Sequence, residues 1–186
     1  YDAKLRKNPD RIQVLLSKSG NAWGIPLKIT KGVTIEEKSS TLEIAYLIEG
    51  IPTDAELHFG VEFNFAGMPT GADDRYFYDA GDQTYGQLGT ELDLHDIDGL
   101  GLVDQWLGLD VHLQANRPTG FWAFPVGTVS QSESGIELVH QSVVVQPHWI
   151  VRGDKHGRWS VVMQLELDTS LAKQRQEQAD EELVTV

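Results

Sequence analysis

Cysteine is absent from this sequence of 186 residues. The chain therefore has no disulfide, no thiolate metal site and no thiol nucleophile. This composition fits a reducing compartment, so we expect a cytoplasmic protein. Long apolar runs are missing too: no segment approaches the ~20 residues of a membrane-spanning helix, and no signal peptide opens the chain. The first residue is Tyr1 rather than methionine, as expected for an expressed fragment or for numbering that begins after processing.

Basic residues are few, with 15 Lys and Arg against 28 Asp and Glu, and the formal net charge is −13. Nucleic-acid phosphates and anionic membrane surfaces repel such a chain, so neither is an expected partner. Signature motifs are absent as well, because the sequence holds no P-loop, no G-x-G-x-x-G, no G-x-S-x-G and no H-E-x-x-H. We therefore expect no cofactor and no zinc site.

An acidic segment at residues 93–99 suggests a calcium loop. An EF-hand loop with its glycine at Gly99 would need acids where Leu94 and Gln105 stand, so the EF-hand interpretation fails. An irregular, oxygen-ligated calcium site stays open.

Helical periodicity is nearly absent, and alternation of apolar and polar residues dominates. The even positions of Leu42–Glu49 are apolar, and so are Val161 and Met163 between the polar positions of Trp159–Asp168. About ten such short strands, separated by turn signals, predict an all-β fold: an antiparallel sandwich or supersandwich. A parallel sheet would need crossover helices, which the sequence does not supply.

The sequence predicts one domain with polar ends. We expect residues 1–11 to be the end of a linker and residues 12–168 to form the β-sandwich domain. Residues 169–186 are expected to be a polar tail, either a marginal helix or disordered, because their apolar residues form no wide stripe. The Gly- and Asp-rich segment 73–101 predicts a long loop region over one end of the sandwich.

Two predicted strands carry a polar face that could hold a ligand. In residues 56–65 that face includes Glu62 and Asn64, which are either ligand-binding groups or an ordinary solvated face. In residues 103–113 it includes Asp104, Trp106 and Asp110. Sugars pack their C–H faces on aromatic rings while carboxylates and amides bind the hydroxyls. Trp106 is the leading candidate for such a ring among five tryptophans, and the competing interpretation is a core residue.

A polar segment at residues 128–135 offers further hydrogen-bonding groups, among them Gln131 and Glu133. The alternative is a hairpin rich in turn-forming residues.

Several motifs in fixed order resemble a known family. They are Phe59-Gly60-Val61-Glu62-Phe63-Asn64-Phe65, Asp74-Arg75-Tyr76-Phe77-Tyr78, Val103-Asp104-Gln105-Trp106-Leu107-Gly108-Leu109, the segment Trp122 to Glu133, and Gln141 to Trp149. The series resembles the C-terminal β-domain of the α-amylase/4-α-glucanotransferase enzymes of glycoside hydrolase family 57. The resemblance covers roughly residues 12–168, with departures at Gly127 and Ser134, where an acid and a glycine are expected.

This resemblance implies a β-supersandwich like that of galactose mutarotases. It also implies an N-terminal catalytic barrel in the same polypeptide that carries the nucleophile and the general acid, so no catalytic residue is expected in this chain. The domain would bind an α-glucan oligosaccharide or polysaccharide and pack on the barrel. The positions carried over as carbohydrate-binding candidates are Glu62, Asn64, Asp104, Trp106, Gln131 and Glu133.

Two other functions compete with a glucan-binding module. One is a purely structural domain without a sugar site. The other is a mutarotase-like sugar epimerase, which needs a general base and a general acid beside one sugar. Glu62 or Glu133 would be the base in that case, and His58, His112 or His140 the acid.

Overall fold

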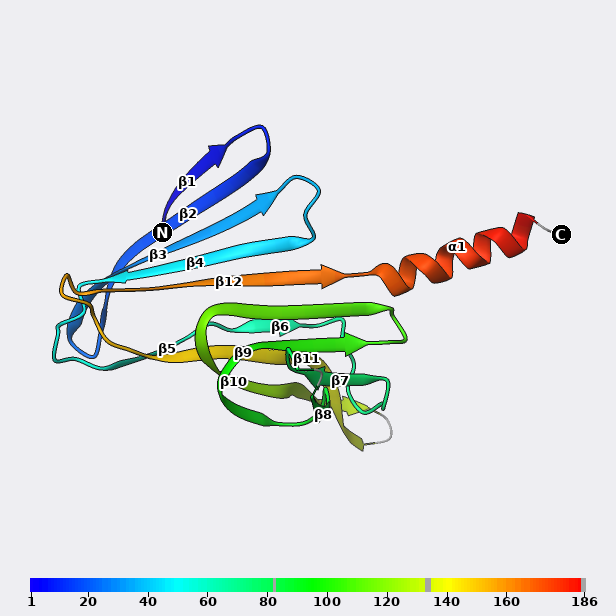
Figure 1. Cartoon of the computed structure of the whole chain (residues 1–186). Coiled ribbons are helices and arrows are strands. Elements are labelled where there is room, and N and C mark those ends of the chain that lie inside the picture. The colour runs from blue at the N-terminus through cyan, green and yellow to red at the C-terminus, as the bar shows by residue number, and fades with distance from the viewer. Residues whose placement is uncertain (82, 133–134, 185–186) are drawn as a thin grey trace.

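A computed structural model describes residues 1–81, 83–132 and 135–184, and it is almost entirely antiparallel sheet (Figure 1). The only helix in those ranges is α1 (Ser170–Val184). The strands are β1 (Asp2–Lys7), β2 (Arg11–Ala22), β3 (Ile25–Glu36), β4 (Thr41–Glu49), β5 (Leu57–Gly60), β6 (Phe63–Phe65), β7 (Arg75–Tyr78), β8 (Thr84–Gln87), β9 (Leu92–Asp104), β10 (Leu109–Ser132), β11 (Gly135–Val151) and β12 (Arg158–Asp168).

The strands form one continuous hydrogen-bonded sheet in the order β1-β2-β3-β4-β12-β10-β9-β7-β8. β11 pairs with the second half of β10, and β5 and β6 pair with β11. The long strands β9 and β10 contribute to both layers. Their pairing register shifts between Gln114 and Thr119, where the two strands pass from one layer to the other. Figure 1 shows the result, with β1–β4 and β12 above and β5–β11 below.

The hydrophobic core lies between these two layers. Ile44 and Ile48 of β4 and Val161 and Met163 of β12 face it from one layer. The other layer contributes Phe121, Ala123, Val143, Val145, Trp149 and Val151. The predicted all-β, antiparallel supersandwich is therefore confirmed, together with the inward faces of β4 and β12.

The alternation across residues 56–65 also holds. Phe59, Phe63 and Phe65 pack against the core, and His58, Glu62 and Asn64 are exposed on the opposite side. The segment is broken into β5 and β6 around Val61, whose N–H bonds the Pro147 carbonyl.

The prediction of a long loop over residues 73–101 is wrong. β7, β8 and the first part of β9 occupy most of this segment. Asp96 has a positive φ of 55°, and the register of β9 against β10 shifts on both sides of Ile97. The core positions are even at Leu92 and Leu94, odd at Ile97, and even again at Leu100 and Leu102. A bulge of this kind hides a strand from period-two analysis because the inward parity changes along its length.

Residues 103–113 do not form one strand, which corrects the prediction that Asp104, Trp106 and Asp110 share a face. β9 ends at Asp104 and β10 begins at Leu109, with a tight turn between them. An Asp104 oxygen accepts the Leu107 N–H at 2.9 Å. Gly108 closes the turn at φ 68°, where an added Cβ would meet the Ala172 backbone nitrogen at 2.6 Å.

The chain ends also differ in part from expectation. Residues 1–11 were predicted to be a linker, yet β1 pairs with β2 from Asp2↔Ser17 to Lys7↔Ile12. Alternation is weak in β1 because its exposed position demands no inward face. At the other end, α1 occupies the segment for which a marginal helix or a disordered tail was expected. Among the described residues, no helix is long and apolar enough to cross a membrane.

Candidate functional site

The outer surface of the lower layer gathers aromatic, imidazole and carboxylate side chains. We call it the Trp122 face, and it consists of the side chains on β5, β6, β9, β10 and β11 that point away from the core. Strand register brings its members together: Asp93 of β9 pairs with Trp122 of β10, which pairs with Gln146 of β11. Two residues further along the strands, Gly120 of β10 pairs with His148 of β11, and His148 pairs with Gly60 of β5.

Trp122 is the centre of this face. Its indole Nε1 donates to the Asp93 carboxylate at 2.9 Å, and its ring stacks on His148 at 4.1 Å between ring centroids. The His58 ring meets it edge-on at 5.2 Å. His95 lies 3.5 Å from the same Asp93 carboxylate. Trp122 is thus a partly exposed aromatic side chain beside a carboxylate and imidazoles, a combination typical of small-molecule sites.

The two histidines form a coupled pair. His58 Nε2 and His148 Nδ1 are 3.0 Å apart, so one of these nitrogens donates and the other accepts. Both rings cannot be protonated without losing this bond, because two N–H groups would then oppose each other. His148 packs flat over Gly120, whose added Cβ would lie 2.4 Å from the ring, and its Nε2 is buried without a hydrogen-bond partner. A hollow of about 500 Å³ lined by Arg117, Gly120 and His148 adjoins the ring.

The pKa of His148 is lowered from its ordinary value of 6.5, first because burial disfavours the imidazolium and second because His58 is close. As pH falls, unfolded His148 therefore takes up its proton around pH 6.5, and the folded ring takes up its proton at a lower pH. Since the unfolded state then binds more protons, the free energy of unfolding falls as pH decreases through this window.

We expect this pH dependence to be measurable by urea unfolding at pH 7 and pH 5. The His148→Asn variant should lose less stability between the two pH values than the parent chain. The control is His156→Asn, because His156 is an exposed side chain. Equal losses in the parent and His148→Asn would show that His148 is not the group that titrates.

Glu62 and Asn64 also lie on the Trp122 face, one two-residue strand repeat from Gln146 along β11. Asn64 Nδ2 donates to the Glu62 carboxylate at 2.7 Å, and its Oδ1 accepts from Ser142 at 3.2 Å. Asn64 pairs with Val144, two residues from the Gln146 that faces Trp122. The structure thus brings these two sequence-predicted residues close to the Trp122 face.

The other predicted site residues lie elsewhere. Asp104 is fully buried, and Arg75 Nε donates to its carboxylate at 2.9 Å, so it lines no surface. Trp106 is 68% exposed on the β9–β10 turn, and its carbonyl accepts from Arg175 of α1. Gln131 is exposed near the end of β10, and Glu133 lies outside the described residues.

Only some of the acid–base candidates of an epimerase lie together: His58 and Glu62 are on the Trp122 face, and Glu133 lies outside the described residues. His140 bonds the Met68 carbonyl, and His112 stacks on Tyr78 where β10 pairs with β12. Tyr78 donates there to Asp110, whose pKa is raised chiefly by burial. Within the described ranges no group of three or more histidine, aspartate or glutamate side chains is arranged to hold a metal ion.

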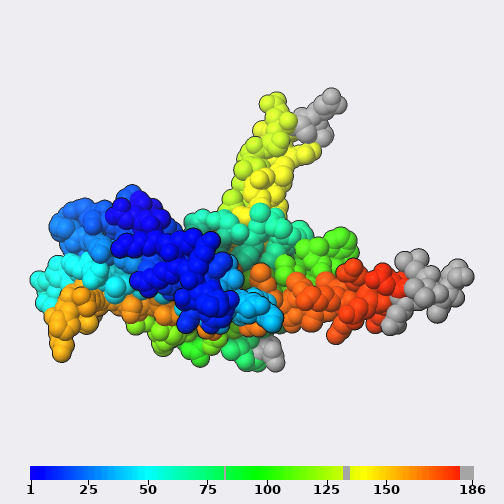
Figure 2. All heavy atoms as spheres, turned by 90° about the horizontal axis from the view of Figure 1, so that it is seen from above, coloured from blue at the N-terminus to red at the C-terminus, as the bar shows by residue number. Residues whose placement is uncertain are grey.

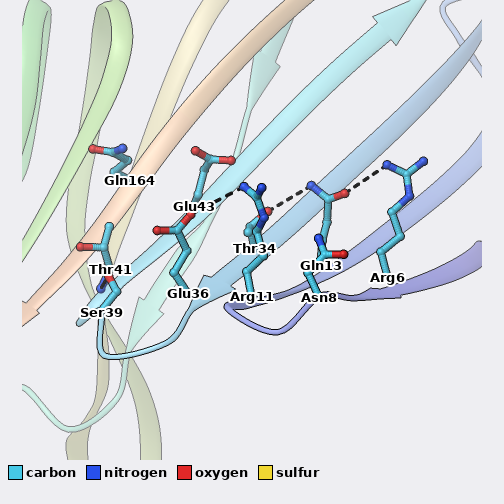
Figure 3. A pocket seen from close by; sticks show the side chains of 10 residues that line it. All are labelled: Arg6, Asn8, Arg11, Gln13, Thr34, Glu36, Ser39, Thr41, Glu43 and Gln164. Atoms are coloured by element: carbon cyan, nitrogen blue, oxygen red, sulfur yellow. Dashed lines mark hydrogen bonds and ion pairs between the residues drawn. The ribbon is translucent and has the colours of Figure 1, made fainter.

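A second polar surface lies on the outside of the upper layer, and Figure 3 shows it close by. It is a groove of about 580 Å³ in which Arg6 donates to Gln13 and Gln13 donates to Thr34. Arg11 reaches Glu36 across it at 3.8 Å. All ten lining residues are polar or charged, so this groove offers no aromatic surface on which a sugar ring could stack.

Sequence reasoning missed Trp122, His148 and Asp93 as site residues. Each follows the alternation of its strand and points opposite to core residues such as Phe121 and Trp149. That signal was present in the sequence. What the sequence lacked was the pairing register that places the three residues side by side.

Comparison with known proteins gives a consistent result. The family model described as "Alpha-amylase/4-alpha-glucanotransferase, C-terminal" matches residues 1–163. "Alpha-amylase 1" of Dictyoglomus thermophilum is 28% identical over 147 residues, which are 76% of this chain and 20% of that protein. The chain therefore spans about a fifth of the length of this relative.

Solved structures show the same fold. The 4-alpha-glucanotransferase from Thermococcus litoralis matches with a TM-score of 0.57 at 17% identity, over 88% of this chain and 22% of that one. A candidate aldose 1-epimerase from Klebsiella pneumoniae matches with a TM-score of 0.59 at 11% identity, over 96% of this chain and 57% of that one.

Proposed function

Since this chain belongs to the family of alpha-amylase/4-alpha-glucanotransferase C-terminal domains, we propose that it is the glucan-binding, non-catalytic module of a family 57 glycoside hydrolase or glucanotransferase. In this proposal the polypeptide also carries a catalytic barrel that acts on α-glucans. The absence of cysteine supports a cytoplasmic location.

The observation that carries the proposal is the Trp122 face. An indole that is held by Asp93 and stacked on His148 presents a fixed aromatic surface. The hydroxyls of a glucose residue stacked there would meet Asp93, Gln146 and His58. Glu62 and Asn64 are proposed to bind the next glucose unit, because they lie one repeat further along the same face.

Three sequence-predicted residues keep separate roles in the proposal. Trp106 is the rival aromatic surface, but the Asp104 carboxylate that the sequence predicted beside it is buried. Gln131 and Glu133 are proposed as contacts only for a glucan long enough to reach the end of the β10–β11 hairpin.

Titration calorimetry of this chain with maltoheptaose tests the proposal. We expect a saturable heat by millimolar ligand, where binding corresponds to about 4 kcal/mol. Cellopentaose, whose glucose units are β-linked, is the matched control and should give no saturable heat. Absence of heat with both sugars would favour a purely structural module that packs on the catalytic domain.

A further inference from the structure

Beyond the body of the molecule, β10 and β11 continue together as a two-stranded arm. The arm consists of residues 127–132 and 135–140, paired from Gly127↔His140 to Ser132↔Gly135. Figure 2 shows it rising from the body in yellow-green and yellow. β9 pairs with β10 only as far as Ala123, and β6 pairs with β11 only as far as Val143. Among the described residues, therefore, no third strand flanks the arm.

One face of this arm is apolar and exposed. Val129 pairs with Leu138, and the adjacent pair on the same face is Gln131 with Ile136. Val129 is 72% exposed, Leu138 is 76% exposed and Ile136 is 80% exposed. Scattered exposed apolar residues are ordinary, but three on one face of a projecting hairpin form a contact surface. A two-stranded hairpin is also marginally stable in water unless its apolar face is covered.

The base of the arm fixes its direction. His140 Nε2 contacts the Met68 carbonyl at 3.1 Å, and Gln141 donates to Thr128 across the hairpin. The arm therefore starts from the rigid lower layer, and its apolar face is presented at a defined place beside the body.

Two occupants could cover the apolar face: a second copy of the chain or another domain of the same polypeptide. Each copy carries a formal net charge of −13, so association of two copies brings together like charges. The relatives favour the second occupant, because this chain covers only 20% of one relative and 22% of another. A domain tethered in the same polypeptide is present at about millimolar effective concentration, so even a small apolar patch suffices for docking.

We propose that the arm docks its Val129–Ile136–Leu138 face into an apolar depression on the catalytic domain of the same polypeptide. This inference rests on the proposed function, since it requires that domain. It assigns Val129, Ile136 and Leu138 of the β10–β11 arm to domain packing, whereas Trp122 and its neighbours are assigned to the glucan.

Hydrogen exchange tests this contact. The arm amides of residues 128–131 and 136–139 are compared between this chain alone and the polypeptide that includes the catalytic domain. We expect the catalytic domain to slow their exchange at least ~10-fold, as burial of an exposed hairpin does. The double variant Ile136→Ser/Leu138→Ser should abolish the slowing, whereas Ser130→Ala on the opposite face should retain it. The Val143–Val145 amides report whether each variant is folded.

Two outcomes would overturn the inference. One is exchange of the arm amides that is equally fast with and without the catalytic domain. The other is a dimer of this chain in sedimentation equilibrium that Leu138→Ser dissociates, which would make the second copy the occupant. The Ile136→Ser/Leu138→Ser variant leaves the Trp122 face unchanged, and its maltoheptaose titration should match that of the parent chain, so the glucan-binding proposal and the arm contact can fail separately. A polypeptide without a catalytic domain would overturn both.

Discussion

Replacement of Asp104 by alanine is expected to destabilise the domain by about 3–5 kcal/mol, because removal of one partner leaves a buried ion pair uncompensated. Asp104 has no exposed surface, and the Arg75 side chain that it binds is only 15% exposed. The same carboxylate accepts the Leu107 N–H and so fixes the β9–β10 turn. Thermal unfolding should show a midpoint lower by roughly 10 °C.

Two further variants distinguish the loss of the buried charge from the loss of the Leu107 hydrogen bond and from the general effect of removing an acid from this strand. Asp104→Asn keeps an oxygen for the Leu107 N–H but removes the charge, so we expect an intermediate loss. Asp98→Ala changes an exposed acid on the same strand and should alter stability by less than about 0.5 kcal/mol. If Asp104→Ala unfolded at the same temperature as the parent but lost glucan affinity, Asp104 would be a ligand-binding residue after all.

Replacement of Trp122 by alanine is expected to weaken maltoheptaose binding at least ~10-fold, equivalent to about 1.4 kcal/mol. The variant removes the aromatic surface and also releases Asp93 and His148 from their contacts with the indole. Trp122→Phe keeps an aromatic face without the N–H donor and should lose less affinity. Calorimetry gives the dissociation constant, and circular dichroism verifies that each variant is folded.

The matched control is Trp106→Ala, which removes an indole of 68% exposure from the β9–β10 turn. Binding that survives Trp106→Ala and fails in Trp122→Ala would locate the glucan on the lower layer. The reverse result would locate it on the turn and remove Trp122 from the site.

Much of the fold followed from the amino-acid sequence. The alternation in β4 and β12 correctly identified Ile44, Ile48, Val161 and Met163 as inward, because a half-buried strand must place apolar side chains on every second residue. The ordered motifs from Phe59 to Trp149 indicated the family, which the match over residues 1–163 confirmed. For the site, the sequence offered Glu62 and Asn64 on a polar face, and that face is polar and exposed.

Prediction from the local sequence pattern failed where the chain changes direction but the alternation of apolar and polar residues continues. Residues 103–113 alternate like a strand, yet Asp104 and Gly108 close a turn in the middle, so Trp106 and Asp110 belong to different surroundings. In β9 the inward parity changes at Ile97, beside the positive φ of Asp96, and changes back by Leu100, so the strand resembled a loop. Neither event changes the composition of the segment, so period-two analysis does not detect it.

By itself, then, the sequence determined the all-β class, the inward residues of the regular strands and the family. Only the tertiary structure decided that Trp122, Asp93, His148 and His58 share one surface, and that Asp104 is a buried partner of Arg75. The physical reason is that strand faces are local properties of a two-residue repeat, whereas neighbours across a sheet depend on pairing register between distant segments, as for His58 and His148, which are 90 residues apart.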